Sequence, residues 1–379
     1  MRFLYVAPRY HTNQVPIMEG LIKDGNEILF LSHYAGDTED YNYIMPVIVG
    51  YSPLSNLLFG IIGKIKKWSP EQLSLKKMKS GFPRYRKLYQ YIKDFRPDIA
   101  ILRERSVYTI YATRICRRLK IPTILYNQSP LWDLPPKNDL AHRIVRSLTP
   151  EKRMTPVSGT IGDGKMIDSN SYFVPFVMPL MFSPEQKKYN SDGILRILTI
   201  GKYKEQKNYF MMIDAISDLM NYSQGNIHLT IVGECASEVQ EDYFRRLEKK
   251  ISECKLNENV ILYKNLNREE VFREYEKADL FIIAAIGEVA GISMLEAMAH
   301  SLPVICSDTD GSSCYVEYGV NGYIAIEKQR ESLTEALIKV YENIAQIPAM
   351  GAASYDIIAN KCCFNSYFDS IIEITKEKV

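Results

Sequence analysis

The stretch GEVAGISMLEAMAHSLPVICSD, residues 287–308, places two glutamates in a segment that is otherwise almost entirely apolar or small. It follows the apolar run DLFIIAA, which predicts a buried strand, and Pro303 stops the helix predicted for GISMLEAMAH. A helix that is apolar nearly all round is a buried helix, and a carboxylate on it needs a hydrogen-bond partner. Glu288, just before the helix, and Glu296, one turn into it, are therefore candidate functional residues.

Each glutamate suits a particular kind of ligand. An ionised carboxylate can accept hydrogen bonds from two hydroxyls, so Glu296 suits a vicinal diol. Glu288 lies beside the free N–H groups of the first helical turn, which form an anion site suited to phosphate. The alternative is a structural role, since the helix dipole alone favours a glutamate early in a helix. Two glutamates at this spacing around a glycine favour the functional interpretation.

The remaining pattern predicts an α/β protein. Candidate strands are FLYVA, EILFL, DIAIL and PTILY in the first half, and RILTIG, HLTIVG, NVILY, DLFIIAA and LPVICSD in the second. Continuous apolar strands separated by amphipathic helices indicate parallel sheets covered on both faces. We predict two doubly wound Rossmann-like domains facing a cleft, at residues 1–185 and 192–360, with a helix at 361–379 returning to the first domain.

Composition sets broader limits. The 379 residues are 46% hydrophobic and 24% charged, which is typical of a globular chain of two domains. Seven scattered cysteines without a C-x-x-C motif indicate a reducing cytoplasm and argue against zinc. The opening residues MRFLYVAP read as a strand and not as a signal peptide. No apolar run reaches the ~18 residues that a membrane span needs.

Polar or glycine residues directly follow several of the predicted strands. Ligands of doubly wound sheets bind outside the carboxyl ends of the strands, so these positions form the expected binding edge of each domain. A dinucleotide oxidoreductase is disfavoured, because no G-x-G-x-x-G motif follows the first strand. The residues at these strand ends are Arg9, His11, Asn13, Arg103, Asn127, Gly201, Lys202, Lys207 and Glu288.

The segment from about Leu195 to Ala325 resembles a known family. Its two glutamates form an E-x7-E motif, which MLEAMAHSLPVI extends. TIGKYKEQKN resembles a G-R-x4-K segment with Lys202 in the arginine's place, and GVNGYI resembles a closing D-G-x-x-G turn. These motifs resemble the C-terminal domain of the retaining family-four nucleotide-sugar glycosyltransferases, of GT-B fold. Before Pro175 only the strand–helix order and RPDIAIL agree with that family.

The resemblance implies a role for each donor-side residue. Glu296 binds the ribose hydroxyls of the donor nucleotide, Glu288 contacts the donor sugar near its reacting face, and Lys202 and Lys207 hold the diphosphate. Two cations beside a helix N-terminus match a diphosphate, so no metal and no cofactor are expected beyond a UDP-, GDP- or similar nucleotide-sugar. Both glutamates must then face the gap between the domains, free of internal ion pairs. The other implied donor-binding positions are Gly201, Ala290, Gly291, Ile292 and Ser293.

Departures from the family's pattern concern the sugar and the acceptor. Cys314 stands where the family usually has a further glutamate, and Asn127 stands where a histidine often follows the fourth strand. The first loop, normally rich in glycine, reads PRYHTNQ. The sugar and the acceptor therefore do not follow from the resemblance.

The first loop offers acceptor-side candidates. His11 can hydrogen-bond the acceptor or donor sugar and joins Glu288 as a candidate catalytic residue, while Arg9 can meet a phosphate. The alternative is a loop that caps the first helix, with Thr12 or Asn13 as the N-cap. Solvated surface arginines and a turn asparagine are the alternatives for the other strand ends. The acceptor-side candidates are Arg9, Asn13, Arg103 and Asn127, with Arg105 beside them.

Positive charge gathers in one part of the chain. Residues 51–120 hold 17 Lys/Arg and 4 Asp/Glu, about +13, so the remaining residues sum to about −11 (2 − 13). SNLLFGIIGKIKKW joins an apolar run to lysines, as in interfacial helices that lie on anionic bilayers. An anionic membrane surface is thus an expected partner of residues 55–93, and an ordinary packed helix is the alternative. Nucleic acid is disfavoured, because no reader motif accompanies the charge.

We therefore expect a metal-independent, retaining hexosyltransferase-type enzyme. It moves a sugar from a nucleoside-diphosphate sugar to a hydroxyl acceptor, a glycan or lipid-linked glycan of the cell surface, in polysaccharide biosynthesis. The expected location is cytoplasmic and peripheral at the inner face of the cell membrane. One alternative is an epimerase or hydrolase of the nucleotide-sugar. The other is a non-catalytic partner subunit that binds a nucleotide-sugar.

Overall fold

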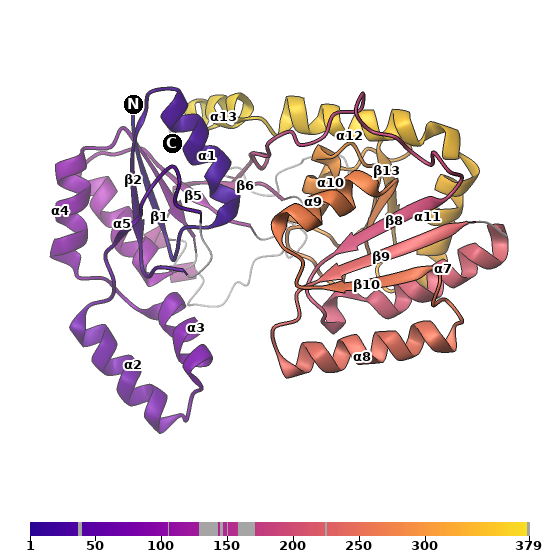
Figure 1. The fold of residues 1–379 in the computed structure, drawn as a ribbon. Helices are drawn as coiled ribbons and strands as arrows, with labels where there is room; N and C mark the ends of the chain where they lie inside the picture. Colours follow the sequence, from indigo (N-terminus) through magenta and orange to yellow (C-terminus); the bar gives the residue numbers. More distant parts are fainter. Residues whose placement is uncertain are drawn as a thin grey trace.

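Two α/β domains make up the protein, each built on its own parallel sheet (Figure 1). Every strand pair in both sheets is parallel. The predicted fold class of two doubly wound domains is thus confirmed. The structure is a computed structural model that describes residues 1–36, 40–104, 106–128, 143–144, 147–149, 151–157, 171–223 and 226–376.

The first sheet has the strand order β3-β2-β1-β4-β5-β6-β7. One face is covered by α1 and the C-terminal α13, and the other by α4 and α5. The first-domain elements are β1 (Arg2–Ala7), η1 (Thr12–Gln14), α1 (Val15–Lys23), β2 (Glu27–Ser32), β3 (Val47–Ile48), α2 (Pro53–Ile65), α3 (Pro70–Ser80), α4 (Tyr85–Phe95), β4 (Ile99–Arg103), α5 (Val107–Arg118), β5 (Thr123–Tyr126), β6 (Lys152–Thr155) and β7 (Ser171–Phe173).

The second sheet has the order β10-β9-β8-β11-β12-β13. Its faces are covered by α7, α8 and α11 on one side and by α9, α10 and α12 on the other. The second-domain elements are β8 (Leu195–Ile200), η3 (Glu205–Lys207), α7 (Tyr209–Ser223), β9 (Ile227–Gly233), α8 (Glu238–Glu253), β10 (Val260–Lys264), α9 (Arg268–Lys277), β11 (Leu280–Ile283), α10 (Ile292–Ala299), β12 (Val304–Ser307), η4 (Ser313–Tyr315), β13 (Gly322–Ala325), α11 (Arg330–Glu342), η5 (Ile344–Gln346) and α12 (Ile347–Lys361).

Both sheets have a point where the strand order reverses. It falls between β1 and β4 in the first sheet and between β8 and β11 in the second. Helices leave the two strands toward opposite faces at such a point, so a crevice opens outside their carboxyl ends. The chain therefore has one expected ligand-binding edge in each domain.

The chain crosses between the domains twice. Lys187, which lies between β7 and β8, donates to the carbonyl oxygens of Tyr275 and Glu276 at 2.7 and 2.6 Å, and so ties that connection to the second domain. At the other end α13 (Phe364–Lys376) packs against the first sheet, where Tyr367 and Ile371 share a core cluster with β1. Figure 1 shows α12 and α13 running from one domain to the other. The domain limits given above stay predictions.

The nine strands expected from apolar runs are all present. The sequence missed the short strands β3, β6, β7 and β13. KRMT of β6 carries two charged residues, and GYIA of β13 follows directly on a turn, so neither shows a long apolar run. Among the helices that the structure describes, none is both long and apolar enough to cross a membrane.

Candidate functional site

The donor-side candidates meet at the reversal point of the second sheet. Gly201 and Lys202 follow β8, Lys207 closes η3, and Glu288 follows the neighbouring β11. Because β8 and β11 are parallel neighbours, their carboxyl ends share one edge. The structure thus brings together residues that stand more than 80 positions apart in the chain.

Glu296 is held by a tyrosine from the preceding helix. The Tyr275 hydroxyl, on α9, donates to Glu296 Oε2 at 3.0 Å and also lies 3.0 Å from the Ser293 carbonyl oxygen. Burial raises the pKa of Glu296, and the Tyr275 hydrogen bond opposes that rise. No protein hydrogen bond to Glu296 Oε1 occurs among the described residues, so this oxygen can accept from a ligand hydroxyl.

The side chain of Tyr275 is itself held in place by burial and by stacking on His300. Its ring is fully buried and stacks on His300 with centroids 4.7 Å apart. His300 Nδ1 lies 2.7 Å from the Glu296 carbonyl oxygen, and burial lowers the pKa of His300 to about 4, so its ring is neutral near pH 7. The sequence analysis missed Tyr275. Its signal was a tyrosine on the core face of α9, since a buried tyrosine hydroxyl needs a partner.

Glu288 forms an ion pair with Lys207. Lys207 Nζ lies 2.6 Å from Glu288 Oε2, and the two side chains are only 13% and 15% exposed. Gly201 makes room for this lysine, because a Cβ on that glycine would lie 2.8 Å from Lys207 Cε. The requirement that both glutamates be free of internal ion pairs is therefore wrong for Glu288. Its partner is the same lysine that the resemblance assigns to the diphosphate.

The turn that carries Glu288 is held in place by hydrogen bonds. Gly287, at φ +56°, donates its N–H to Glu327 Oε2 at 2.8 Å. Gly291 donates its N–H to Ser312 Oγ at 2.8 Å, and Ile292 donates to the Ala290 carbonyl. Two of the amides expected to meet a phosphate are thus already used within the protein. The amides of Ala290 and Ser293 have no acceptor among the described residues.

Asp310 is a buried acid beside this turn that the sequence analysis missed. It is fully buried, and its Oδ2 has no hydrogen-bond partner among the described residues. Burial raises its pKa to about 7, while the backbone N–H of Ser312, which donates to Oδ1, opposes the rise. A Cβ on Gly291 would lie 2.8 Å from Asp310 Oδ2, so only glycine fits there without a shift. The signal was the D-T-D stretch after the strand VICS, in which Asp310 is the second acid.

Lys202 and Lys207 differ in their surroundings. Lys202 pairs with Glu234 at 2.9 Å, and both side chains are about half exposed, at 54% and 49%. Water screens such a pair, so it is weaker than the shielded pair of Lys207. Lys207 is therefore the better placed of the two to discriminate between ligands.

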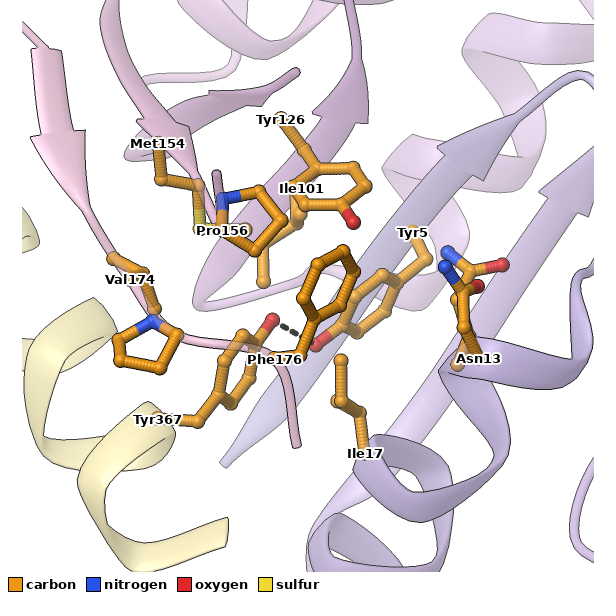
Figure 2. A pocket seen from close by; sticks show the side chains of 12 residues that line it. Tyr5, Asn13, Ile17, Ile101, Tyr126, Met154, Pro156, Val174, Phe176 and Tyr367 are labelled. Atoms are coloured by element: carbon orange, nitrogen blue, oxygen red, sulfur yellow. Dashed lines mark hydrogen bonds between the residues drawn. The ribbon is translucent and has the colours of Figure 1, made fainter. Parts of the chain in front are cut away.

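The first domain has a pocket beside its reversal point. The pocket is small, with a cavity volume of about 20 Å³, and lies between the sheet, α1 and α13. Figure 2 shows Tyr5 and Tyr367 joined by their hydroxyls, 3.1 Å apart, with Asn13 at the rim. Asn13 is the one acceptor-side candidate that lines it. Its other lining residues are Gln14, Ile17, Ile101, Tyr126, Met154, Pro156, Val174, Pro175 and Phe176.

Two other acceptor-side candidates have structural partners. The Arg103 guanidinium lies over the Tyr126 ring, 5.0 Å from its centroid. Asn127 donates to Glu104 Oε2 at 2.9 Å, and Glu104 also pairs with Arg153 at 2.8 Å. Both side chains therefore support the edge of the first sheet. A ligand role for Arg103 or Asn127 stays a prediction.

The first loop does not cap the first helix in the way that the structural alternative expected. Thr12 and Asn13 lie inside η1, and the residue that precedes this turn is His11, which donates its backbone N–H to Gln14 Oε1 at 3.0 Å. His11 is exposed and Arg9 is half-buried, both directly after β1. Arg105 lies outside the described residues. The alternative N-cap assignment to Thr12 or Asn13 is wrong, because both residues lie in η1 and the N-cap residue of α1 is Gln14.

Two Rossmann-like domains facing each other define the GT-B class of glycosyltransferase folds. HepE from Anabaena, solved with UDP and glucose, matches 98% of this chain and 98% of its own at 15% identity, with a TM-score of 0.66. Residues 183–354 match the family model described as "Glycosyl transferases group 1", so this part of the chain is a domain of that family.

Two curated relatives agree with this family. An alpha-1,2-mannosyltransferase of Caenorhabditis elegans, named for GDP-Man and Man(3)GlcNAc(2)-PP-Dol, is 27% identical over 39% of this chain and 33% of its own length. The amylovoran biosynthesis glycosyltransferase AmsK of Erwinia amylovora is 30% identical over 40% of this chain and 37% of its own. The matched part thus spans about a third of these relatives.

Proposed function

We propose that the protein is a retaining glycosyltransferase that uses a nucleoside-diphosphate sugar. The observation that carries the proposal is the pairing of Lys207 with Glu288 beside a carboxylate, Glu296, that keeps one oxygen available to a ligand. These three groups lie at one sheet edge and match the three parts of such a donor. The Lys207 ammonium suits the diphosphate, Glu288 suits the sugar, and Glu296 can accept hydrogen bonds from the ribose hydroxyls.

In this proposal the ion pair opens when the donor binds. A diphosphate offers the Lys207 ammonium more negative charge than one carboxylate does, so the lysine turns to the phosphates. Glu288 is then released to face the sugar. Both side chains are shielded from water, so the electrostatic energy of each new contact is larger here than at an exposed site. The pair thus keeps Lys207 and Glu288 in place until the donor arrives.

The reaction breaks the bond between the anomeric carbon and the phosphate oxygen and forms a bond from that carbon to the acceptor oxygen on the same face. The acceptor's hydroxyl proton passes to the leaving phosphate, so atoms and charge balance without a further reactant. Glu288 supports the positive charge that develops on the sugar. His11 stays a proposed contact to the acceptor or donor sugar from the first domain.

We propose that the acceptor is a glycan or lipid-linked glycan, and that the protein works in the cytoplasm at the inner face of the cell membrane. The named substrate of the mannosyltransferase relative and the polysaccharide named for the AmsK relative support this class. Neither metal nor cofactor is proposed, because Lys207, Lys202 and the amides of Ala290 and Ser293 can neutralise the diphosphate.

The test has a binding arm and a turnover arm. UDP and GDP are added to the purified protein, and the midpoint of thermal unfolding is measured; a ligand at about 100 times its Kd stabilises by about 2.7 kcal/mol. Release of nucleoside diphosphate from UDP- and GDP-sugars is then followed with and without glycan acceptors. Glu288→Gln should lower turnover at least a hundredfold, while the exposed control Glu238→Gln should not.

Other outcomes would separate the alternatives. Product formed at full rate without an acceptor would support the epimerase or hydrolase. Nucleotide binding without turnover on any donor would support the non-catalytic partner, for which Cys314 is the motivating residue. Unchanged turnover in Glu288→Gln would remove that residue from the proposed mechanism.

A further inference from the structure

Helix α2 (Pro53–Ile65) shows an apolar stripe to solvent. Its large apolar residues recur at intervals of three and one, so they lie along one side of the helix. All six are exposed, from 37% for Ile62 to 75% for Ile65. The stripe consists of Leu54, Leu57, Leu58, Ile61, Ile62 and Ile65.

The side of α2 that faces the protein carries Ser55, the half-buried Phe59 and Gly63, and none of the six residues of the stripe. Its buried residues are Ser55 and Gly63. Ser55 Oγ accepts the N–H of Phe82 at 3.3 Å, and a Cβ on Gly63 would lie 3.2 Å from Leu73 Cδ1 on α3. A helix of a globular core buries its apolar side. In α2 only Phe59 of the large apolar residues is half-buried on the inward side, and all six Leu and Ile residues of the stripe face solvent.

Positive charge borders the stripe. The hairpin formed by α2 and α3, residues 53–80, carries six lysines and one acid, Glu71. Lys64, Lys66 and Lys67 follow one another at the end of α2, all exposed, and form no ion pair among the described residues. Figure 1 shows the α2–α3 hairpin standing away from both sheets. An apolar stripe beside exposed lysines matches a surface that is both apolar and anionic.

We propose that the α2–α3 hairpin docks the protein on an anionic lipid bilayer, with the stripe of α2 immersed at the level of the headgroups. Thirteen residues of helix are about 20 Å long, less than the ~30 Å of the hydrocarbon core, so α2 lies in the plane of the bilayer. The inference stands independently of the proposed function, because none of its residues belongs to the donor site.

Charge and shape decide between the candidate occupants. A second copy of the chain would bring its own lysine cluster against the first, and like charges at close range repel. A protein partner would need an acidic groove that encloses a helix standing out from the surface. A bilayer adapts to a convex helix, and its anionic headgroups lie on both sides of the immersed helix.

The test uses the full chain and vesicles of two compositions. Vesicles of 30% phosphatidylglycerol in phosphatidylcholine should co-sediment the protein, and vesicles of phosphatidylcholine alone should bind it at least tenfold more weakly. The triple substitution of Lys64, Lys66 and Lys67 to Glu should weaken binding roughly 100-fold, at about fivefold or more per basic residue. Raising the salt concentration to 0.5 M should weaken wild-type binding too.

The apolar contribution is tested separately. Leu57→Ser with Ile61→Ser should weaken binding at least tenfold, because both side chains would leave the bilayer. Val239→Ser, 79% exposed on α8 of the second domain, is the matched control and should change nothing. Circular dichroism and the unfolding midpoint check that each variant is folded.

Three results would overturn the proposal. The first is equal binding to both vesicle compositions, or none to either. The second is binding that survives both the lysine and the stripe substitutions. The third is a stable dimer in sedimentation equilibrium that Leu57→Ser converts to monomer, which would assign the stripe to a second copy. Because the wild-type salt and lipid series needs no variant, the proposal is decided even if a variant misfolds.

Discussion

The hydrogen bond between Tyr275 and Glu296 allows a quantitative prediction. Tyr275→Phe keeps the buried ring against His300 and removes only the hydroxyl that lies 3.0 Å from Glu296 Oε2. A hydrogen bond to a charged group contributes about 1.5–3 kcal/mol to stability, and the carboxylate left behind stays half-buried. We therefore expect the free energy of unfolding to fall by about 1.5–3 kcal/mol at pH 8, measured by urea denaturation.

The pH dependence of this loss has a defined sign. Burial raises the pKa of Glu296 in the folded protein, and the Tyr275 hydrogen bond opposes the rise, so the variant's folded pKa is higher still. A raised carboxyl pKa costs stability above the folded pKa and costs nothing below the unfolded one. The loss in Tyr275→Phe should thus shrink as the pH falls from 8 to 4.

The assay includes a matched control and a functional readout. Tyr263→Phe, on the exposed side of β10, should change stability by less than about 0.5 kcal/mol. If Glu296 accepts ribose hydroxyls, Tyr275→Phe should also weaken nucleoside diphosphate binding by up to tenfold, measured by calorimetry. A loss below 0.5 kcal/mol at pH 8, or an equal loss at both pH values, would refute the idea that Tyr275 supports an ionised Glu296.

Three further predictions concern the turn around Glu288. Lys207→Met should weaken nucleoside diphosphate binding at least tenfold by calorimetry, and Lys202→Met should weaken it less, because Lys202 is half exposed. Burial raises the pKa of Asp310 to about 7, so its contribution to stability falls as the pH rises from about 4 to 7. In urea denaturation, the free energy of unfolding of Asp310→Asn relative to wild type should therefore rise by on the order of 2 kcal/mol between pH 5 and pH 8. Gly291→Ala should cost about 1–3 kcal/mol by overpacking, whereas Gly60→Ala, with open space around its Cβ position, should be neutral or stabilising in thermal unfolding.

Much of the fold follows from local pattern. The nine apolar runs predict nine strands correctly, because a strand buried on both faces needs apolar residues at every position. Short edge strands such as β3 and β7 lack such a run and cannot be recognised this way. The placement of the donor-side residues at one edge also follows, since parallel strands bring their carboxyl ends together.

The candidate site was predicted in its members but not in its contacts. The spacing of Glu288 and Glu296 identified both carboxylates. It could not show that Lys207 reaches Glu288 across 81 positions, or that Tyr275 holds Glu296. Asp310 was missed because acids such as Asp308 and Asp310 are common after a strand, and only the complete burial of Asp310 makes it unusual.

The amino-acid sequence alone determined the two parallel sheets, the position of the glutamate pair and the concentration of positive charge in residues 51–120. These properties depend on residue type and spacing along a continuous segment. Tertiary structure alone decided that Glu288 is paired, that Glu296 keeps one oxygen available, and that α2 turns its apolar side outward. Periodicity shows that a helix has two different sides, but which side meets solvent depends on what the rest of the chain packs against it.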